Sequence, residues 1–289
     1  MARVSGALIA GSSSESSPPK QSGRRHMEVT EVRTLNVLRL GLLPLALLLG
    51  GTTLAAAPVQ VLLPEGSTRG FLRIRSPEGA RLGHGELVQR MRGNDLESHL
   101  VLSFDDGSIY DEVTAYSQHG VFRLDAYRLT QRGPSFPGAE IAFDRKTGRY
   151  QAKVRGRIGA AEEQASGEFE MPTDLYNGMA LTLLKNLPPG KGVTAQLAAF
   201  TPKPRLLRME LRREGEDRVV FGGNAKQATR LLVNLNVGGL TGVVASLMGK
   251  TPPDLRYWLV PGEVPAFVRF EGAMFLNGPV WRVEMAGAD

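Results

Sequence analysis

The chain has 289 residues, an apolar fraction of 42% that is ordinary for a globular protein, a formal net charge of +6, and no cysteine. The absence of cysteine excludes disulfides, thiol catalysis, thiolate metal sites and the lipid attachment of a bacterial lipoprotein. Six basic and three acidic residues fall within residues 1–57, so the remaining chain is only mildly basic and does not indicate nucleic-acid binding.

The N-terminal residues predict an extension followed by a signal peptide. Residues 1–26 are rich in Ser, Pro and Arg and have little to bury, so we expect a disordered extension or a start site assigned too far upstream. Residues 27–57 combine two arginines, a short apolar stretch and the small residues of "LAAA", as a cleaved signal peptide does. Cleavage after Ala55 or Ala57 would release the protein into the periplasm or the medium. An uncleaved N-terminal membrane anchor is the alternative.

After a lead-in at residues 58–82, residues 83–289 are predicted to form a single antiparallel β domain. Apolar and polar residues alternate there in short stretches separated by turn signals. The clearest hairpin is predicted at residues 98–117 around "DG", because both turn positions tolerate a positive φ. Further hairpins are predicted around residues 146–148 and 214–217. Regularly spaced short strands without βαβ alternation favour a sandwich or barrel.

The last predicted strands carry both tryptophans and have one apolar face each. Strict alternation places the following residues on those faces: Val264, Ala266, Val268 and Phe270 in one strand, and Trp281, Val283 and Met285 in the next. Charged residues alternate with them and lie opposite. The pattern predicts a one-sided, curved sheet with a bend at Gly272.

Two segments interrupt the strands and are predicted to be short helices. The first, residues 174–187, follows Thr173, a good N-cap, and carries an apolar stripe around more than half of its circumference. It ends at "LPPG", because proline prevents continuation. The second lies at residues 239–249 and is edged by glycines. The predicted fold is all-β and mainly antiparallel: a strongly curved sheet or incomplete barrel, with the two helices plugging or capping its concave face.

The apolar stripe of the first helix has two interpretations. The helix either fills the core or lines a cavity that holds an apolar ligand, and both can be true at once. The candidate ligand-binding residues come from this helix and the last strands: Tyr176, Met179, Leu183, Val268, Phe270 and Trp281. Each of them is equally suited to a dry core.

Motifs for catalysis or metal binding are missing from the sequence. Outside the leader there are three histidines, His84, His99 and His119, and none is paired at helical ligand spacing. Asp105-Asp106-Gly107 fits a hairpin turn better than a calcium loop. Neither a phosphate-binding loop nor a Gly-x-Ser-x-Gly elbow occurs. We therefore expect a non-catalytic protein without cofactor or metal, and a hydrolase with an unrecognised site is the least favoured alternative.

The order of these elements resembles that of known envelope proteins. The stretches "LSFDDGSIYDEVTAYSQHGVFRLDAYRLTQRGPSFP" and "MPTDLYNGMALTLLKNLP" are similar to uncharacterised exported bacterial proteins of half-barrel architecture. The layout over residues 83–286 resembles that of the LolA and LolB type of periplasmic lipid and lipoprotein carriers. That resemblance implies a curved, incompletely closed sheet wrapped around apolar helices, and a lipid as ligand. It carries over no functional residue.

Together these features predict an exported, periplasmic protein that binds a lipid or another hydrophobic small molecule between its sheet and its helices. Contact with the membrane is expected only through the leader or transiently. The alternative is an envelope scaffold or assembly factor with a filled core, which acts by docking a protein partner. A void between residues 174–187 and the last strands favours the carrier, whereas a filled interior favours the scaffold.

Overall fold

Fourteen strands form one antiparallel sheet in the computed structural model, which describes residues 57–236 and 254–287. The strands are β1 (Thr68–Arg75), β2 (Arg81–Arg92), β3 (Asp95–Phe104), β4 (Ile109–His119), β5 (Val121–Arg132), β6 (Ala139–Asp144), β7 (Arg149–Val154), β8 (Glu163–Glu168), β9 (Val193–Phe200), β10 (Pro204–Phe221), β11 (Asn224–Asn236), β12 (Leu255–Val260), β13 (Ala266–Ala273) and β14 (Val280–Met285). The described residues contain one helix, α1 (Ala180–Lys185).

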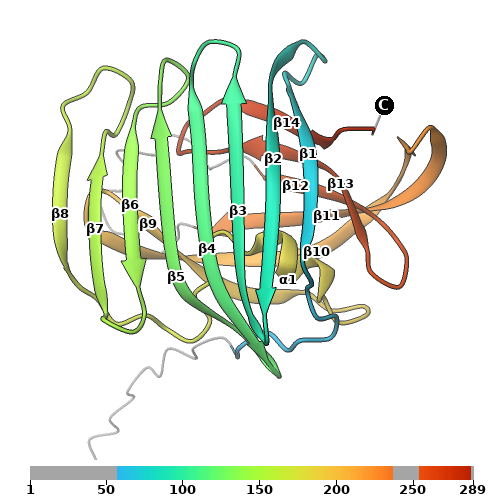
Figure 1. Cartoon of the computed structure of the whole chain (residues 1–289), viewed down its shortest axis with the longest axis horizontal. Helices are drawn as coiled ribbons and strands as arrows, with labels where there is room; N and C mark the ends of the chain where they lie inside the picture. Colours follow the sequence, from blue (N-terminus) through green and yellow to red (C-terminus); the bar gives the residue numbers. More distant parts are fainter. Residues whose placement is uncertain (1–56, 237–253, 288–289) are drawn as a thin grey trace, which may run out of the picture. The chain divides into compact units, whose positions relative to one another are not determined.

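The sheet does not close on itself. Its strand order is β8-β7-β6-β5-β4-β3-β2-β1-β14-β13-β12-β11-β10-β9, so β8 and β9 are its two edges. In Figure 1, strands β2–β8 stand side by side in one layer and strands β9–β13 cross behind them. The predicted all-β, incompletely closed antiparallel architecture is confirmed.

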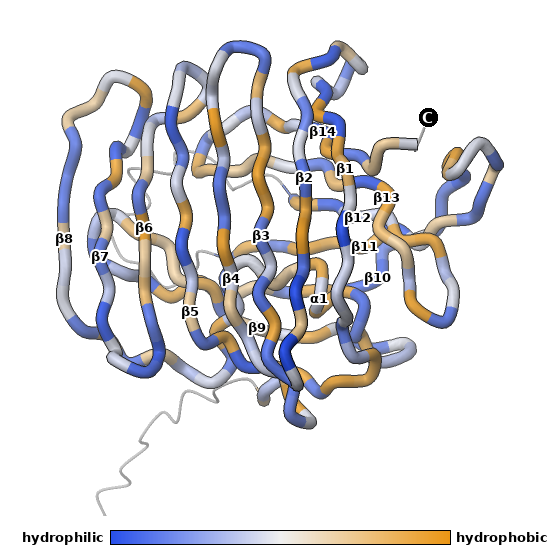
Figure 2. The backbone as a smooth tube through the Cα atoms, in the orientation of Figure 1, coloured by the Kyte–Doolittle hydropathy of each residue, from blue (hydrophilic) through white to orange (hydrophobic). Residues whose placement is uncertain are grey.

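The sheet begins earlier in the chain than residue 83. β1 lies inside the predicted lead-in and pairs with both β2 and β14, so it connects the N-terminal and C-terminal parts of the sheet. Leu72 and Ile74 of this strand are buried, and they alternate with charged residues that point outward. Figure 2 shows the same alternation of apolar and polar positions along β2–β5.

Two of the three predicted hairpins are confirmed. β3 and β4 are joined through Gly107, with a φ of +86°, and β6 and β7 through Gly148, with a φ of +69°. Both glycines occupy the left-handed region that these turns need. The glycine signal therefore identified the turns correctly.

The predicted hairpin at residues 214–217 is wrong. β10 continues through these residues, and its turn to β11 follows at two glycines, residues 222–223. Glu214 and Asp217 remain on the strand because Arg230 of β11 binds both, with nitrogen–oxygen distances of 2.9 and 2.7 Å. The acidic residues that suggested a turn in the sequence therefore belong to a cluster of ion pairs between two strands.

The first predicted helix starts later than residue 174. Gly178 has a φ of +72°, and this left-handed conformation interrupts any helix that would run through it. Met179, not Thr173, takes the N-cap position, and it makes no side-chain cap hydrogen bond. The second predicted helix, residues 239–249, lies outside the described residues.

The segment before α1 runs alongside the edge strand β9 instead of forming a helix. The amide of Gln196 donates to the carbonyl of Asp174 (2.8 Å), and the amide of Tyr176 donates to the carbonyl of Gln196 (2.9 Å). The side chain of Asn177 accepts from the amide of Ala198 (2.8 Å) and donates to its carbonyl (2.9 Å). These contacts satisfy groups that an edge strand would otherwise leave open.

Candidate ligand cavity

The described residues leave part of the interior of the sheet unfilled. A cavity of about 790 Å³, here called the main cavity, lies between α1 and the strands that surround it. A pocket of about 300 Å³, here called the side pocket, shares part of its lining, including Tyr110, Tyr127 and Leu235. Both are lined mostly by apolar side chains, and their volumes fall in the range of small-molecule sites, roughly 300–1,000 Å³.

One side of α1 lines the main cavity, and the other side packs into the core. Ala180, Leu181 and Lys185 line the cavity, whereas Leu183 and Leu184 are fully buried in the main apolar cluster. The helix is held between the two layers, because it packs on β10 and its Thr182 hydroxyl lies 3.5 Å from that of Tyr116 on β4. A short helix therefore separates a packed core from an open space.

The last strands form the opposite wall of the main cavity, and a β-bulge in β13 decides which of its side chains face the cavity. The register of β12 and β13 shifts between Arg269 and Phe267, so Val268 is the extra residue of a β-bulge. Phe267 and Phe270 both line the main cavity. Val268 instead packs with Trp258 in a separate cluster. The expectation that Val268 shares the apolar face of Phe270 is therefore wrong, and the bulge is the reason.

Two of the six predicted residues, Tyr176 and Phe270, line the main cavity. The hydroxyl of Tyr176 is already engaged: it donates to the carbonyl of Phe122 and accepts from the amide of Val59, both at 3.0 Å. Tyr176 therefore offers its ring to the cavity and uses its hydroxyl to hold the N-terminal lead-in against β5. The role of both residues in binding stays a prediction.

The other predicted residues are in the core. Met179 and Leu183 are 1% and 0% exposed and line neither pocket. Trp281 is buried among aromatic rings, with centroids 4.9 Å from Phe104 and 5.3 Å from Phe136. The sequence could not separate these positions from cavity positions, because all of them are equally apolar.

One charged group that the sequence analysis did not single out borders the main cavity from β4. Glu112 lies on the inward face, between Tyr110 and Thr114 in the alternation of the strand. Its Oε1 accepts hydrogen bonds from the hydroxyls of Tyr110 (2.9 Å) and Tyr127 (2.7 Å). Burial raises the pKa of the Glu112 carboxyl above its ordinary value, while the two tyrosine hydrogen bonds oppose that shift.

The second oxygen of this carboxylate is open to the cavity. Oε2 of Glu112 has no hydrogen-bond partner among the described residues, and it is not one of their fully enclosed polar atoms. Tyr257 of β12 adds its hydroxyl to the same region, again without a protein partner in the described part of the chain. Burial, and secondarily Glu112, raises the pKa of Tyr257. A polar centre therefore faces an otherwise apolar space.

The remaining charges of the main-cavity lining neutralise each other. Lys185 of α1 and Glu65 of the lead-in form an ion pair of 3.0 Å, and their side chains are only 12% and 5% exposed. Oε1 of Glu65 is enclosed and has no partner in the described structure. Because the lysine charge is compensated, Glu112 is the charge of this lining that is left without a counter-ion among the described residues.

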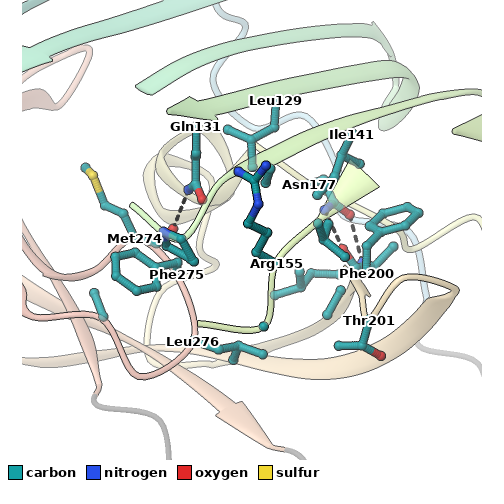
Figure 3. Close-up of a pocket in the computed structure, with 18 of the residues that line it drawn as sticks. Leu129, Gln131, Ile141, Arg155, Asn177, Phe200, Thr201, Met274, Phe275 and Leu276 are labelled. Carbon is teal, nitrogen blue, oxygen red and sulfur yellow. Dashed lines mark hydrogen bonds between the residues drawn. The ribbon is translucent and has the colours of Figure 1, made fainter. Parts of the chain in front are cut away.

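The side pocket opens between β5–β7, β9 and the loop after β13. Figure 3 shows Gln131 donating to the carbonyl of Met274 and the guanidinium of Arg155 extending across the centre of the view. Arg155 is paired with Glu162 at 3.0 Å. Phe200 and Leu276 complete an apolar floor. Glu163 also lines the side pocket, so the charge of its one arginine is compensated by acidic neighbours.

None of the described residues that line the two pockets is a histidine. His99 pairs with Asp111 at 3.0 Å on the outward face of β3 and β4, and His119 contacts Asn94. The described residues hold no group of three or more His, Asp or Glu side chains able to bind a metal ion. In the same part of the chain, no helix has the length and apolar character needed to cross a membrane.

Comparison with known proteins gives a structural neighbour but no family. Neither a family model nor a curated protein sequence matches the chain. A crystal structure described as a beta-barrel-like protein of domain of unknown function DUF1849, from Brucella abortus, aligns with a TM-score of 0.44 at 10% identity. The alignment covers 78% of this chain and 98% of that one. The resemblance to the LolA and LolB carriers is not confirmed and stays a prediction.

Proposed function

We propose that the protein is an exported, non-catalytic binding protein that holds a lipid or another apolar molecule in the main cavity. One observation carries the proposal: a void of about 790 Å³ lies between α1 and the last strands. Ala180 and Leu181 line it on one side, and Phe267 and Phe270 on the other. The apolar lining of such a cavity stays in contact with water until an apolar ligand covers it, and its removal from water favours binding.

The edges of the sheet argue against the scaffold alternative. β9 is covered by residues 174–177, as described above. β8 is short and carries Glu163 and Glu168 among its exposed positions. Covered or charged edges are typical of sheets that avoid pairing with another chain. A protein partner would have to bind elsewhere.

The polar groups of the cavity argue against a hydrolase. Glu112 accepts two hydrogen bonds from tyrosines, and no histidine or serine nucleophile hydrogen-bonds to it. A nucleophile needs a base within hydrogen-bonding reach, and that base in turn needs an orienting group. Among the described residues, the cavity therefore offers an anchor for a ligand but no nucleophile hydrogen-bonded to Glu112 as an acyl-transfer site would need.

Native mass spectrometry of the protein purified after export in a bacterial host tests the proposal. We expect a bound adduct that organic extraction releases as an apolar molecule. Leu181→Trp should abolish the adduct, because Leu181 lines the cavity. Leu206→Trp is the matched control, since Leu206 is 39% exposed on β10. Met179→Trp is unsuitable, because Met179 is in the packed core.

A bare wild-type protein that also fails to bind added phospholipid, fatty acid and fatty alcohol would overturn the proposal. Loss of the adduct in both tryptophan variants would overturn the assignment of the ligand to the main cavity, because the control substitution leaves that cavity unchanged. The export part of the proposal has its own readout. N-terminal sequencing of the exported protein should give a start after Ala55 or Ala57.

A further inference from the structure

We propose that Glu112 selects the ligand by its head group: an apolar chain that carries a hydrogen-bond donor, either a hydroxyl or a protonated amine. This inference rests on the proposed function and names the ligand class of the same cavity. Its basis is the direction of the hydrogen bonds around Glu112. Tyr110 and Tyr127 both donate to Oε1, so their hydroxyl hydrogens are used, and Oε2 is left as an acceptor.

The acceptor faces the space that the ligand would occupy. Oε2 has no partner among the described residues and is not enclosed by protein, so the group opposite it must come from solvent or from a ligand. A buried carboxylate that gains a donor is stabilised more than a neutral acceptor would be, because charge-assisted hydrogen bonds are roughly twice as strong. Tyr257 supplies a further hydroxyl beside the same space. A donor-bearing head group satisfies this arrangement.

The charges of the lining disfavour an anionic head group. A fatty-acid carboxylate beside Glu112 would place two like charges together away from bulk water. Lys185 does not offset this, because it is already paired with Glu65 at 3.0 Å. Arg155 lines the side pocket and not the main cavity, and it is paired with Glu162. The main cavity therefore favours fatty alcohols and amines over fatty acids of the same chain length.

A set of ligands with one chain and different heads tests the inference. The readout is displacement of N-phenylnaphthylamine, a dye that brightens in apolar sites, from the purified full chain at about pH 8, where fatty-acid carboxylates are ionised. Dodecanol and dodecylamine should displace the dye at concentrations about tenfold or more below that of dodecanoate, the difference that one hydrogen bond to a charged group supports.

Glu112→Gln should reverse this preference. The amide oxygen can still accept from both tyrosines, but the position of Oε2 becomes a donor. Dodecanol and dodecylamine should then lose about tenfold in affinity, and dodecanoate should gain. Asp111→Asn is the matched control, since it removes the same charge from the outward face of the same strand, where Asp111 pairs with His99. It should leave the ranking unchanged.

The outcomes separate this inference from the proposed function. Equal displacement by all three ligands, or an unchanged ranking in Glu112→Gln, would overturn the selection by Glu112 while leaving an apolar carrier. A dye that does not bind, together with no binding of any of the three ligands by direct titration, would overturn the carrier itself. If Glu112→Gln fails to fold, Tyr127→Phe is the second variant. Removing one donor leaves Oε1 with free acceptor capacity, so the preference for dodecanol over dodecanoate should rise by severalfold, and an unchanged preference would contradict the inference.

Discussion

Replacement of Gly178 by alanine should be strongly destabilising, because the position is constrained in two ways. Its φ is +72°, a conformation that costs an L-residue about 1–2 kcal/mol. A Cβ there would also clash with Oγ1 of Thr114 and lie 3.2 Å from the ring of Tyr127. Relief of such overpacking costs a further amount of about 1–3 kcal/mol. We expect a total loss of about 2–5 kcal/mol in the free energy of unfolding.

Gly148→Ala separates the two contributions. Gly148 has a nearly identical φ of +69°, but a Cβ there would meet nothing within 4 Å. This control should lose only the conformational part, about 1–2 kcal/mol. Urea unfolding with a constant m-value measures both variants on the same scale. Equal losses in Gly178→Ala and Gly148→Ala would refute the steric reasoning.

A double mutant tests the named contact. In the Thr114→Ala background Oγ1 is gone, and the nearest remaining atoms are in the ring of Tyr127, at 3.2 Å, and the Cβ of residue 114, at 3.3 Å. Gly178→Ala should therefore cost less in that background than in the wild type, with a coupling energy of about 0.5–3 kcal/mol. A coupling near zero would mean that the chain moves away from β4 without losing its contacts.

Three further predictions concern the cavity and its walls. Tyr176→Phe leaves the buried amide of Val59 without its acceptor and should lower the unfolding free energy by about 1–3 kcal/mol, whereas Tyr150→Phe, whose hydroxyl has no protein partner in the described structure, should be nearly neutral in the same urea assay. Glu112 has a raised pKa because it is buried, so its neutral form stabilises the fold below the unfolded pKa of about 4.3 and this contribution is lost as pH rises through the folded value. The stability of wild type relative to Glu112→Gln should therefore fall from pH 4 to pH 8, and a constant difference would contradict this prediction. The groups that face Glu112 are Tyr110, Tyr127 and Tyr257. All three stay neutral in this range because their pKa values are raised. Phe267→Ala should weaken dye binding because Phe267 lines the cavity, whereas Val268→Ala should lower stability without changing dye binding. Dye titration of the two variants measures this difference. If β13 had no bulge, Val268→Ala would be the variant that weakens dye binding.

The strands were predictable because their turns and alternation are local properties. Gly107 and Gly148 mark turns through a conformation that few other residues adopt. The failures come from contacts between distant residues. Arg230 keeps Glu214 and Asp217 on a strand, and nothing in the local sequence indicates that this arginine lies opposite them.

The helix prediction failed for a related reason. The apolar spacing of residues 175–184 fits a helix. Asn177 instead hydrogen-bonds to the edge strand β9, and Gly178 lies against β4. In β13 the bulge at Val268 shifts the face of every residue on one side of it, so strict alternation across Phe267 and Phe270 could not hold. Bulges depend on the partner strand, and the sequence of β13 alone does not reveal one.

The position of Glu112 was visible in the sequence, but its meaning was not. β4 alternates Tyr110, Glu112, Thr114 and Tyr116 with a second face that begins at Ile109. The second face is at least as apolar, so the alternation did not indicate which one points inward. Only the packing of Tyr116 and Thr114 against α1 and its preceding loop settles the orientation. A carboxylate that shares a strand face with buried residues such as Tyr116 indicates a polar site inside the fold.

The cavity and the carboxylate explain each other better than either is explained alone. A buried carboxylate with one open oxygen is costly in dry surroundings, and an adjoining cavity lowers that cost because water or a ligand can reach Oε2. A solid core would have enclosed this oxygen, as Oε1 of Glu65 is enclosed. Conversely, without an occupant the apolar side chains between Leu181 and Phe267 would remain in contact with water. One occupant, an apolar chain with a donor at its head, would fill the void and pair the oxygen, whereas a scaffold with a filled core would account for neither feature.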